Sequence, residues 1–395
     1  MSTTYRDLNP PERLLLGPGP SNVDPRVLRA MSTPLLGHLD PDFLKIMDET
    51  KQLLQYTFQT NNYLTLPVSG TGSAGMETAL CNVIEPGDKV MVCVSGVFGE
   101  RMCDIVERCG AELIRVEAEW GHIIEPEQVE NALKKDKVKI VAIVHAETST
   151  GILQPLGDIG RLAHEHGALF LVDTVTSLGG CPVKVDEWEF DVVYSGTQKC
   201  LSCPPGLAPI TFSPRAEQVL DARKSKVQSW YLDMTMIRRY WGQERFYHHT
   251  APISMCYALR EALRLIYEEG LEARWQRHAL NHRALMSGLQ AMGLQPFAQA
   301  GHWLPSLNAV RVPEGIQDMR VRGRLLQDYG IEIGGGLGKI KGQIWRIGLM
   351  GYNSTRKTVL VFLSALEAVL RGEGYPVPLG GAIAAAEKVY GATTS

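Results

Sequence analysis

ALFLVD, at residues 168–173, is an unbroken apolar run that ends in one acidic residue. Runs of the same kind occur nearby, VMVCV at 90–94, IVAIV at 140–144 and VVY at 192–194. Such continuous hydrophobicity is typical of strands that are covered on both faces. Helical periodicity separates these runs, at residues 73–83, 99–109, 126–133 and 159–166. The alternation predicts an α/β fold, a mostly parallel sheet flanked by helices.

The pattern of predicted elements changes after about residue 270, where longer charged helices alternate with short strands. We therefore expect an N-terminal arm over residues 1–20, a large domain over 21–270 and a smaller α+β domain over 271–395. The Gly/Ala-rich tail after about residue 371 could be ordered or mobile on this reading.

The composition excludes several classes of protein. Hydrophobic residues make up 45% of the 395 residues and charged residues 21%, which is typical of folded globular chains. A net charge of -3 argues against nucleic acid as a partner. The longest aliphatic runs are far shorter than the roughly 20 residues of a membrane helix. Eight cysteines without a dense framework favour a reducing, cytoplasmic location.

GTGSAG, at residues 70–75, follows an apolar segment and opens a helix, as a dinucleotide-binding turn does. The acidic residue that would bind a ribose is absent, because the run at 90–94 continues as Ser-Gly-Val-Phe. A Gly/Ser/Thr-rich helix N-terminus binds phosphate through its free N–H groups. We therefore expect a phosphate cup for a mononucleotide-sized cofactor, with a plain tight turn as the alternative.

Three other motifs point to no established chemistry. GGGLGK at 334–339 has the wrong spacing for a P-loop, and Ile340 stands where Ser or Thr would bind magnesium, so a flexible loop near a site is expected. Cys200 and Cys203 lack a second pair at zinc spacing and are expected to be buried free thiols. His278 and His282 share a helix face and are expected to be exposed to solvent. No metal site is predicted.

Asp173 and Lys199 follow two strands of the predicted sheet, at the edge where ligands bind in such folds. Pyridoxal 5'-phosphate needs a lysine for its covalent attachment and a carboxylate that keeps its ring nitrogen protonated. The turn at 70–73 would hold its phosphate, and Phe98 could stack on its ring. The sequence therefore predicts a pyridoxal-phosphate site.

The chain resembles the alanine–glyoxylate and serine–glyoxylate aminotransferases, which are fold-type I, class V pyridoxal-phosphate enzymes. The resemblance implies an aspartate-aminotransferase-like large domain with a seven-stranded type of sheet. Seven segments carry it, in order from about residue 10 to 370. They are LLLGPGPSN (14–22), SGTGSAGMETAL (69–80), HAETSTGILQP (145–155), VDTVTSLGG (172–180), YSGTQK (194–199), YHHTAP (247–252) and RIGLMG (346–351).

The resemblance also implies roles for single residues. Lys199 would be the catalytic lysine that holds the cofactor, and Asp173 would pair with the ring nitrogen. Arg346 would clamp the substrate carboxylate, and Gly19 would lie over the substrate end of the site. The remaining cofactor-binding residues would be Phe98 on the ring, Thr148 near the ring hydroxyl, Thr71, Gly72, Ser73 and Gln198 on the phosphate, and Tyr247 and Thr250 from the other subunit of a homodimer.

The implied reaction is a ping-pong transamination from L-alanine or L-serine to glyoxylate, which gives glycine and pyruvate or hydroxypyruvate (EC class 2.6.1). Phe98 and Thr148 resemble the plant serine–glyoxylate branch, whereas YHHTAP resembles the alanine branch. The donor therefore stays open among alanine, serine and ureidoglycine.

Other classes of protein fit the sequence less well. A class V cysteine desulfurase or lyase needs a cysteine in the small domain, but the last one, Cys256, precedes it. A nicotinamide oxidoreductase would rest on residues 70–75 alone, and a binding or scaffold protein would leave Asp173 and Lys199 unexplained.

Overall fold

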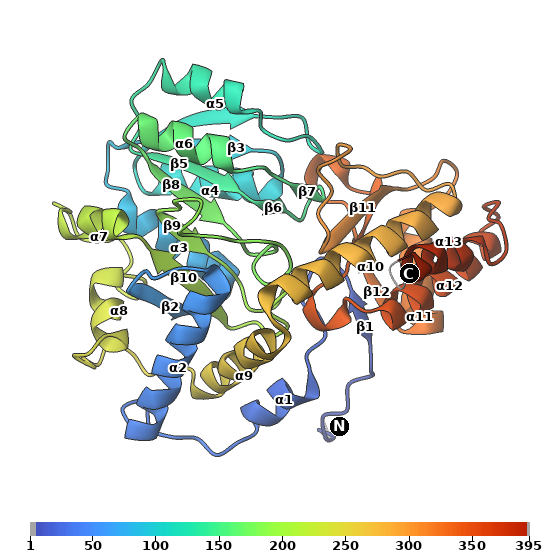
Figure 1. Ribbon diagram of the computed structural model, residues 1–395, viewed down its shortest axis with the longest axis horizontal. Coiled ribbons are helices and arrows are strands. Elements are labelled where there is room, and N and C mark those ends of the chain that lie inside the picture. Colours follow the sequence, from blue (N-terminus) through green and yellow to red (C-terminus); the bar gives the residue numbers. More distant parts are fainter. Residues whose placement is uncertain (1–4, 393–395) are drawn as a thin grey trace, which may run out of the picture.

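The computed structural model describes residues 5–392, which form two large hydrophobic cores and three small hydrophobic clusters. Residues 1–4 of the predicted arm and 393–395 of the predicted small domain lie outside this range. Figure 1 shows the larger unit, with the sheet and its helices, beside a smaller unit formed mainly by the C-terminal third of the chain. No helix within the described range is long and apolar enough to cross a membrane.

The larger unit is built on a seven-stranded sheet, which confirms the predicted fold class. Every neighbouring pair of strands is parallel except the two pairs made by β10. In spatial order the strands are β2 (Leu64–Ser69), β10 (Leu207–Phe212), β9 (Val192–Tyr194), β8 (Leu169–Asp173), β5 (Ile140–Val144), β3 (Lys89–Val94) and β4 (Glu112–Glu117).

Helices flank this sheet, and several begin where the sequence places a capping residue. In α2 the Asp40 side chain accepts a hydrogen bond from the Asp42 N–H, and Pro41 occupies the first turn. The helices of the larger unit are α1 (Pro25–Met31), α2 (Pro41–Phe58), α3 (Gly72–Val83), α4 (Val97–Arg108), α5 (Pro126–Leu133), α6 (Gly157–Glu165), α7 (Pro214–Asp221), α8 (Met234–Trp241) and α9 (Ile253–Glu269). A two-stranded ribbon of β6 (Ala146–Glu147) and β7 (Ile152–Leu153) follows β5.

The smaller unit contains a four-stranded sheet in the order β1, β12, β13, β11. Its first strand comes from the N-terminal segment, and Leu16 is fully buried in the second core. This pairing ties residues 14–16 to the C-terminal third of the chain. The strands and helices are β1 (Leu14–Leu16), α10 (Leu271–Ala291), β11 (Leu307–Arg311), α11 (Asp318–Tyr329), β12 (Ile331–Gly335), β13 (Ile344–Gly348), α12 (Arg356–Gly372) and α13 (Gly381–Gly391).

The Gly/Ala-rich tail forms helix α13, which packs against α10 and α12. Ala382 and Ala386 are fully buried, and the Tyr390 hydroxyl donates to Asn281 Oδ1 at 2.7 Å. Alanine has the highest helix propensity, so the composition that resembles a linker also suits a helix. Packing against α10 stabilises this segment as a helix.

The expectation that His278 and His282 face solvent is wrong. His278 is fully buried, its Nδ1 donates to the Arg274 carbonyl at 2.7 Å, and its Nε2 accepts from the Gly351 N–H at 2.9 Å. His282 Nδ1 donates to Asn308 Oδ1 at 2.6 Å. The polar composition of α10 misleads because this helix packs against α9, α12 and α13.

Candidate active site

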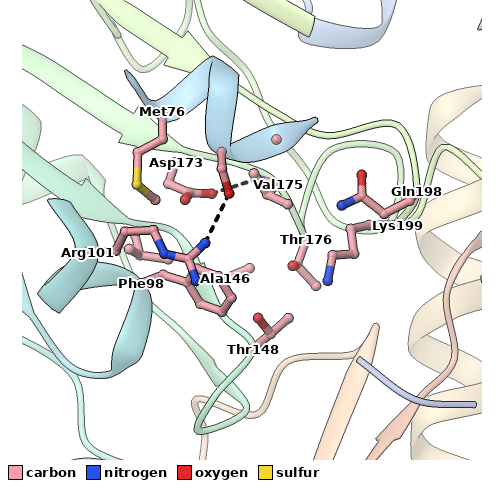
Figure 2. Close-up of a pocket in the computed structure, with 13 residues that line it drawn as sticks. Met76, Phe98, Arg101, Ala146, Thr148, Asp173, Val175, Thr176, Gln198 and Lys199 are labelled. Atoms are coloured by element: carbon pink, nitrogen blue, oxygen red, sulfur yellow. Dashed lines mark hydrogen bonds between the residues drawn. The ribbon is translucent and has the colours of Figure 1, made fainter. Parts of the chain in front are cut away.

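A cavity of about 200 Å³ lies at the carboxyl ends of β5 and β8, where the N-termini of α3 and α4 converge (Figure 2). Five separate parts of the chain form its wall. Its lining consists of Gly72, Ser73, Met76, Phe98, Arg101, Val144, Ala146, Thr148, Asp173, Val175, Thr176, Gln198 and Lys199.

Asp173 is the last residue of β8, and its carboxylate is 2% exposed. The Tyr194 hydroxyl donates to Oδ2 at 2.6 Å, and the Val175 N–H donates to Oδ1 at 2.8 Å. Burial raises the pKa of Asp173 to about 6, although both hydrogen bonds act in the opposite direction. At neutral pH this site therefore presents a buried carboxylate that a cation would stabilise.

Lys199 lies in the turn that follows β9, and it is 9% exposed. Ser21 fixes this turn, since its N–H donates to the Gln198 carbonyl at 2.9 Å and its Oγ to the Lys199 carbonyl at 3.0 Å. Nζ donates to the Pro18 carbonyl. Burial and then the charge of Arg346 lower the pKa of Lys199 to about 8. The amine can thus lose its proton near physiological pH.

The first turn of α3 has the form of an anion cradle. Thr71 caps the helix without a side-chain hydrogen bond, and no described group accepts from the N–H of Gly72 or Ser73. A Cβ on Gly72 would lie 3.4 Å from Val175 and 3.5 Å from Gly196, so the wall of the cavity packs closely around this position. Gln198 Oε1 is buried without a partner in the described chain. The free N–H groups fit a phosphate, to which the Gln198 amide can donate only through Nε2, because Oε1 is an acceptor.

Phe98 and Thr148 lie on the floor of the same cavity. The backbone N–H of Phe98 donates to the buried Glu147 carboxylate at 3.1 Å, which fixes the start of α4. Thr148 follows Glu147 directly and is 2% exposed. Val175 also lines the cavity, so Phe98 and Val175 provide apolar walls for a flat ring.

Arg346 lies in β13 and is 5% exposed. Its Nε donates to the Gly335 carbonyl at 2.7 Å and its Nη1 to the Thr148 carbonyl at 3.2 Å. No carboxylate in residues 5–392 lies within ion-pair distance, and burial lowers the pKa of Arg346 to about 10. A buried guanidinium without an anionic partner is unfavourable, so it marks a place for an anionic ligand.

Of the sequence-predicted residues, the cavity is lined by Gly72, Ser73, Phe98, Thr148, Asp173, Gln198 and Lys199, and not by Gly19, Thr71, Tyr247, Thr250 or Arg346. Gly19 is in contact distance of Lys199, since a Cβ on it would lie 2.6 Å from Lys199 Cδ. Tyr247 and Thr250 do not line the cavity; both are exposed, and their hydroxyl oxygens are 3.5 Å apart. Their predicted place in the other subunit stays a prediction.

Sequence reasoning missed two polar residues near the cavity. Tyr194 is the register partner of Asp173, a relationship that strand pairing alone determines. Arg101 lies three positions after Phe98 on α4, and this spacing could have placed both on one helix face. Among the described residues, no three or more His, Cys, Asp or Glu side chains come together in a way that could hold a metal ion.

Comparison with known proteins gives consistent matches. The family profile described as aminotransferase class-V matches residues 14–357. The (S)-ureidoglycine–glyoxylate transaminase of Bacillus subtilis is 45% identical over 98% of this chain and 97% of its own length. The alanine–glyoxylate aminotransferase of Callithrix jacchus is 43% identical, over 93% and 89%. The crystal structure of alanine–glyoxylate aminotransferase from Nostoc sp. superposes with a TM-score of 0.92 at 50% identity, over 93% of this chain and 98% of that one.

Proposed function

Because the chain belongs to the class-V aminotransferase family, we propose that it transfers the amino group of a small L-amino acid to glyoxylate, which leaves as glycine. With L-alanine as the donor the second product is pyruvate, and with L-serine it is hydroxypyruvate. The family depends on pyridoxal 5'-phosphate, which when bound supplies an electron sink for the negative charge that develops at the substrate Cα.

One observation supports the proposal most directly: the buried Lys199 lines the cavity, and the buried, unpaired Arg346 donates to the carbonyl of Thr148, another cavity residue, at 3.2 Å. The charge of Arg346 also lowers the pKa of Lys199. The guanidinium has N–H groups left over for a substrate carboxylate, which its planar fork can bind in a fixed orientation. A carboxylate held there would bring its Cα near Lys199.

The proposed roles of the cofactor-binding residues follow from the free groups of the site. Thr71, the N–H groups of Gly72 and Ser73, and Gln198 would hold the phosphate. Asp173 would keep the ring nitrogen protonated.

Phe98 and Thr148 would contact the ring. Tyr247 and Thr250 would complete the phosphate site of the other subunit in a homodimer. In this arrangement the cofactor belongs to a large domain over residues 21–270, and Arg346 comes from a small domain over residues 271–395.

Lys199 would move the proton in this reaction. The pKa of Lys199 is about 8, so its Nζ is neutral above that pH and would then accept the proton of the substrate Cα. The Pro18 carbonyl accepts a hydrogen bond from Nζ and would orient the amine before a substrate binds.

The size of the site favours a small donor. Gly19 lies against Lys199, which limits the room for a substrate side chain beside the lysine. Alanine and serine fit such a space. Ureidoglycine is the second candidate, since the relative from Bacillus subtilis is named for it. A cysteine desulfurase is disfavoured because all eight cysteines are buried. These free thiols support a cytoplasmic location.

A side-by-side assay of L-alanine, L-serine and ureidoglycine with glyoxylate tests the proposal. Glycine formation from one or more donors is expected, and Lys199→Ala should reduce it by at least about a thousandfold. The purified protein should be yellow, and an amino donor should discharge the colour. A colourless chain that forms no glycine with any donor would refute the proposal.

A further inference from the structure

Arg101 is an additional charged residue at the proposed phosphate site. It lies on α4 one turn after Phe98 and lines the cavity, with its guanidinium carbon 5.0 Å from the centre of the Phe98 ring. Its Nη1 donates to Ser73 Oγ at 3.0 Å, as the dashed line in Figure 2 shows. One side chain thus connects the starts of α3 and α4.

The charge of Arg101 has no acidic partner among residues 5–392. Arg108 on the same helix differs, because its Nε is 2.9 Å from Asp104 Oδ2. The proposed phosphate ligands Thr71, Gly72, Ser73 and Gln198 are all neutral, whereas a phosphate monoester carries about 1.5 to 2 negative charges at pH 7. Arg101 is placed to balance that charge.

The hydrogen bond between Arg101 and Ser73 has a fixed direction. A guanidinium can only donate, so Ser73 Oγ must accept with one of its lone pairs. The single hydroxyl hydrogen of Ser73 is then free to donate to another group. No described group accepts it, and Ser73 lines the cavity. Ser73 and Arg101 are both exposed, so this hydrogen reaches solvent in the cofactor-free chain and is available to an anion in the cradle.

We propose that Arg101 is the countercharge of the cofactor phosphate and selects the phosphorylated cofactor over the unphosphorylated aldehyde. It acts through Ser73 and through its own remaining N–H groups, which would donate charge-assisted hydrogen bonds to the phosphate. The inference rests on the proposed function, because it assumes that the cavity binds pyridoxal 5'-phosphate. It adds that affinity for the phosphate depends on a residue outside the helix cradle.

The test compares two ligands on the full-length chain after its cofactor has been removed. Pyridoxal 5'-phosphate and pyridoxal are each titrated, with tryptophan fluorescence and visible absorption as readouts. Arg101→Met keeps the apolar contact with Phe98 but removes the charge, and should weaken binding of pyridoxal 5'-phosphate about tenfold or more while that of pyridoxal stays unchanged. Arg101→Lys should restore much of the loss.

Arg108→Met is the matched control, since it removes an arginine from the same helix that is paired with Asp104. It should alter neither affinity. If Arg101→Met weakens both ligands equally, its role is packing against Phe98 and the inference is wrong. Unchanged affinity for both ligands would also overturn it. If the unaltered chain binds neither ligand, the proposed function itself fails.

Discussion

Tyr194 and Asp173 are register partners on the neighbouring parallel strands β9 and β8, and the Tyr194 hydroxyl donates a 2.6 Å hydrogen bond to Asp173 Oδ2. The strand pairing thus fixes both the position of the carboxylate and one of its donors. The other donor, the Val175 N–H, comes from the turn that follows β8. Asp173 is held rigidly in a site where its charge is costly, which suits a group that waits for a cationic partner.

The Tyr194→Phe variant should shift the pH dependence of cofactor binding. Asp173, with a pKa of about 6, is ionised above that pH, so affinity for pyridoxal 5'-phosphate should fall as the pH falls through about 6. Loss of the tyrosine donor raises the pKa of Asp173 further and moves this midpoint upward by about one unit. Titrations of the cofactor-free chain between pH 5 and 8 measure it.

Tyr257→Phe is the control for this experiment. Its hydroxyl donates to the Pro34 carbonyl at 3.3 Å, far along the chain from the cavity residues. The midpoint in this variant should equal that of the unaltered chain. If the midpoint in Tyr194→Phe also equals that of the unaltered chain, the ionisation of Asp173 does not control cofactor binding.

The Asp173→Asn variant should stabilise the cofactor-free chain while it reduces cofactor affinity. The folded-state pKa of Asp173 is raised above the unfolded value, so its ionised form destabilises the fold by about 3 kcal/mol above pH 6. An amide removes this penalty and can still accept from Val175. The thermal midpoint should rise at pH 8 and rise less at pH 5.

Asp191 offers the opposite case for comparison. This carboxylate is 3% exposed but accepts from Ser213 Oγ at 2.9 Å and from the Phe170 N–H at 2.8 Å, and Arg215 lies 3.3 Å away. Asp191→Asn should therefore lower the thermal midpoint. A lower midpoint in Asp173→Asn too would contradict the view that its charge is destabilising.

The sequence predicts the fold class correctly but does not predict all of the strands. The fully apolar strands β3, β5, β8 and β9 follow from composition alone, and the family resemblance is confirmed. β4 was missed because its residues alternate between charged and apolar at the sheet edge, and β10 because Pro209 lies inside it.

The site was predictable where it depends on chain order and less so where it depends on spatial neighbours. Asp173 and Lys199 follow strands, so their convergence can be read from the sequence. Tyr194 contacts Asp173 and Arg101 contacts Ser73, each on a different element, and only the packing of the folded chain brings these pairs together. Tyr247 and Thr250 are exposed in a single chain, and so their proposed role requires a second one.

The Arg346→Gln variant should lose substrate affinity with only a small loss of stability. Two charge-assisted hydrogen bonds to a carboxylate are worth about 3 kcal/mol, which corresponds to a loss of about 100-fold in kcat/KM, mostly through KM. The thermal midpoint should fall less than in a variant of a paired arginine, because the buried guanidinium has no anionic partner among the described residues and only the Gly335 and Thr148 carbonyls lose a donor.

Arg274→Gln is the matched control, because Arg274 is also 5% exposed but is paired with Glu269 at 2.6 Å. Its loss leaves that carboxylate and the Gly179 carbonyl with fewer partners, so the thermal midpoint should fall. Steady-state kinetics and thermal unfolding of both variants make the comparison. Unchanged kinetics in Arg346→Gln would remove this arginine from the substrate site.

The Gly19→Ala variant should impair catalysis through direct contact with Lys199. The added Cβ would lie 2.6 Å from Lys199 Cδ and 2.7 Å from Nζ, distances at which the lysine must move. Gly19 also has a φ of 108°, which is unfavourable for alanine. Gly87→Ala is the control, since Gly87 has a φ of 85° but open space around it. Both variants should lose stability by about 1 kcal/mol from backbone strain, but only Gly19→Ala should lose kcat, by about tenfold or more. Equal kcat in the two variants would show that Lys199 does not depend on the space above Gly19.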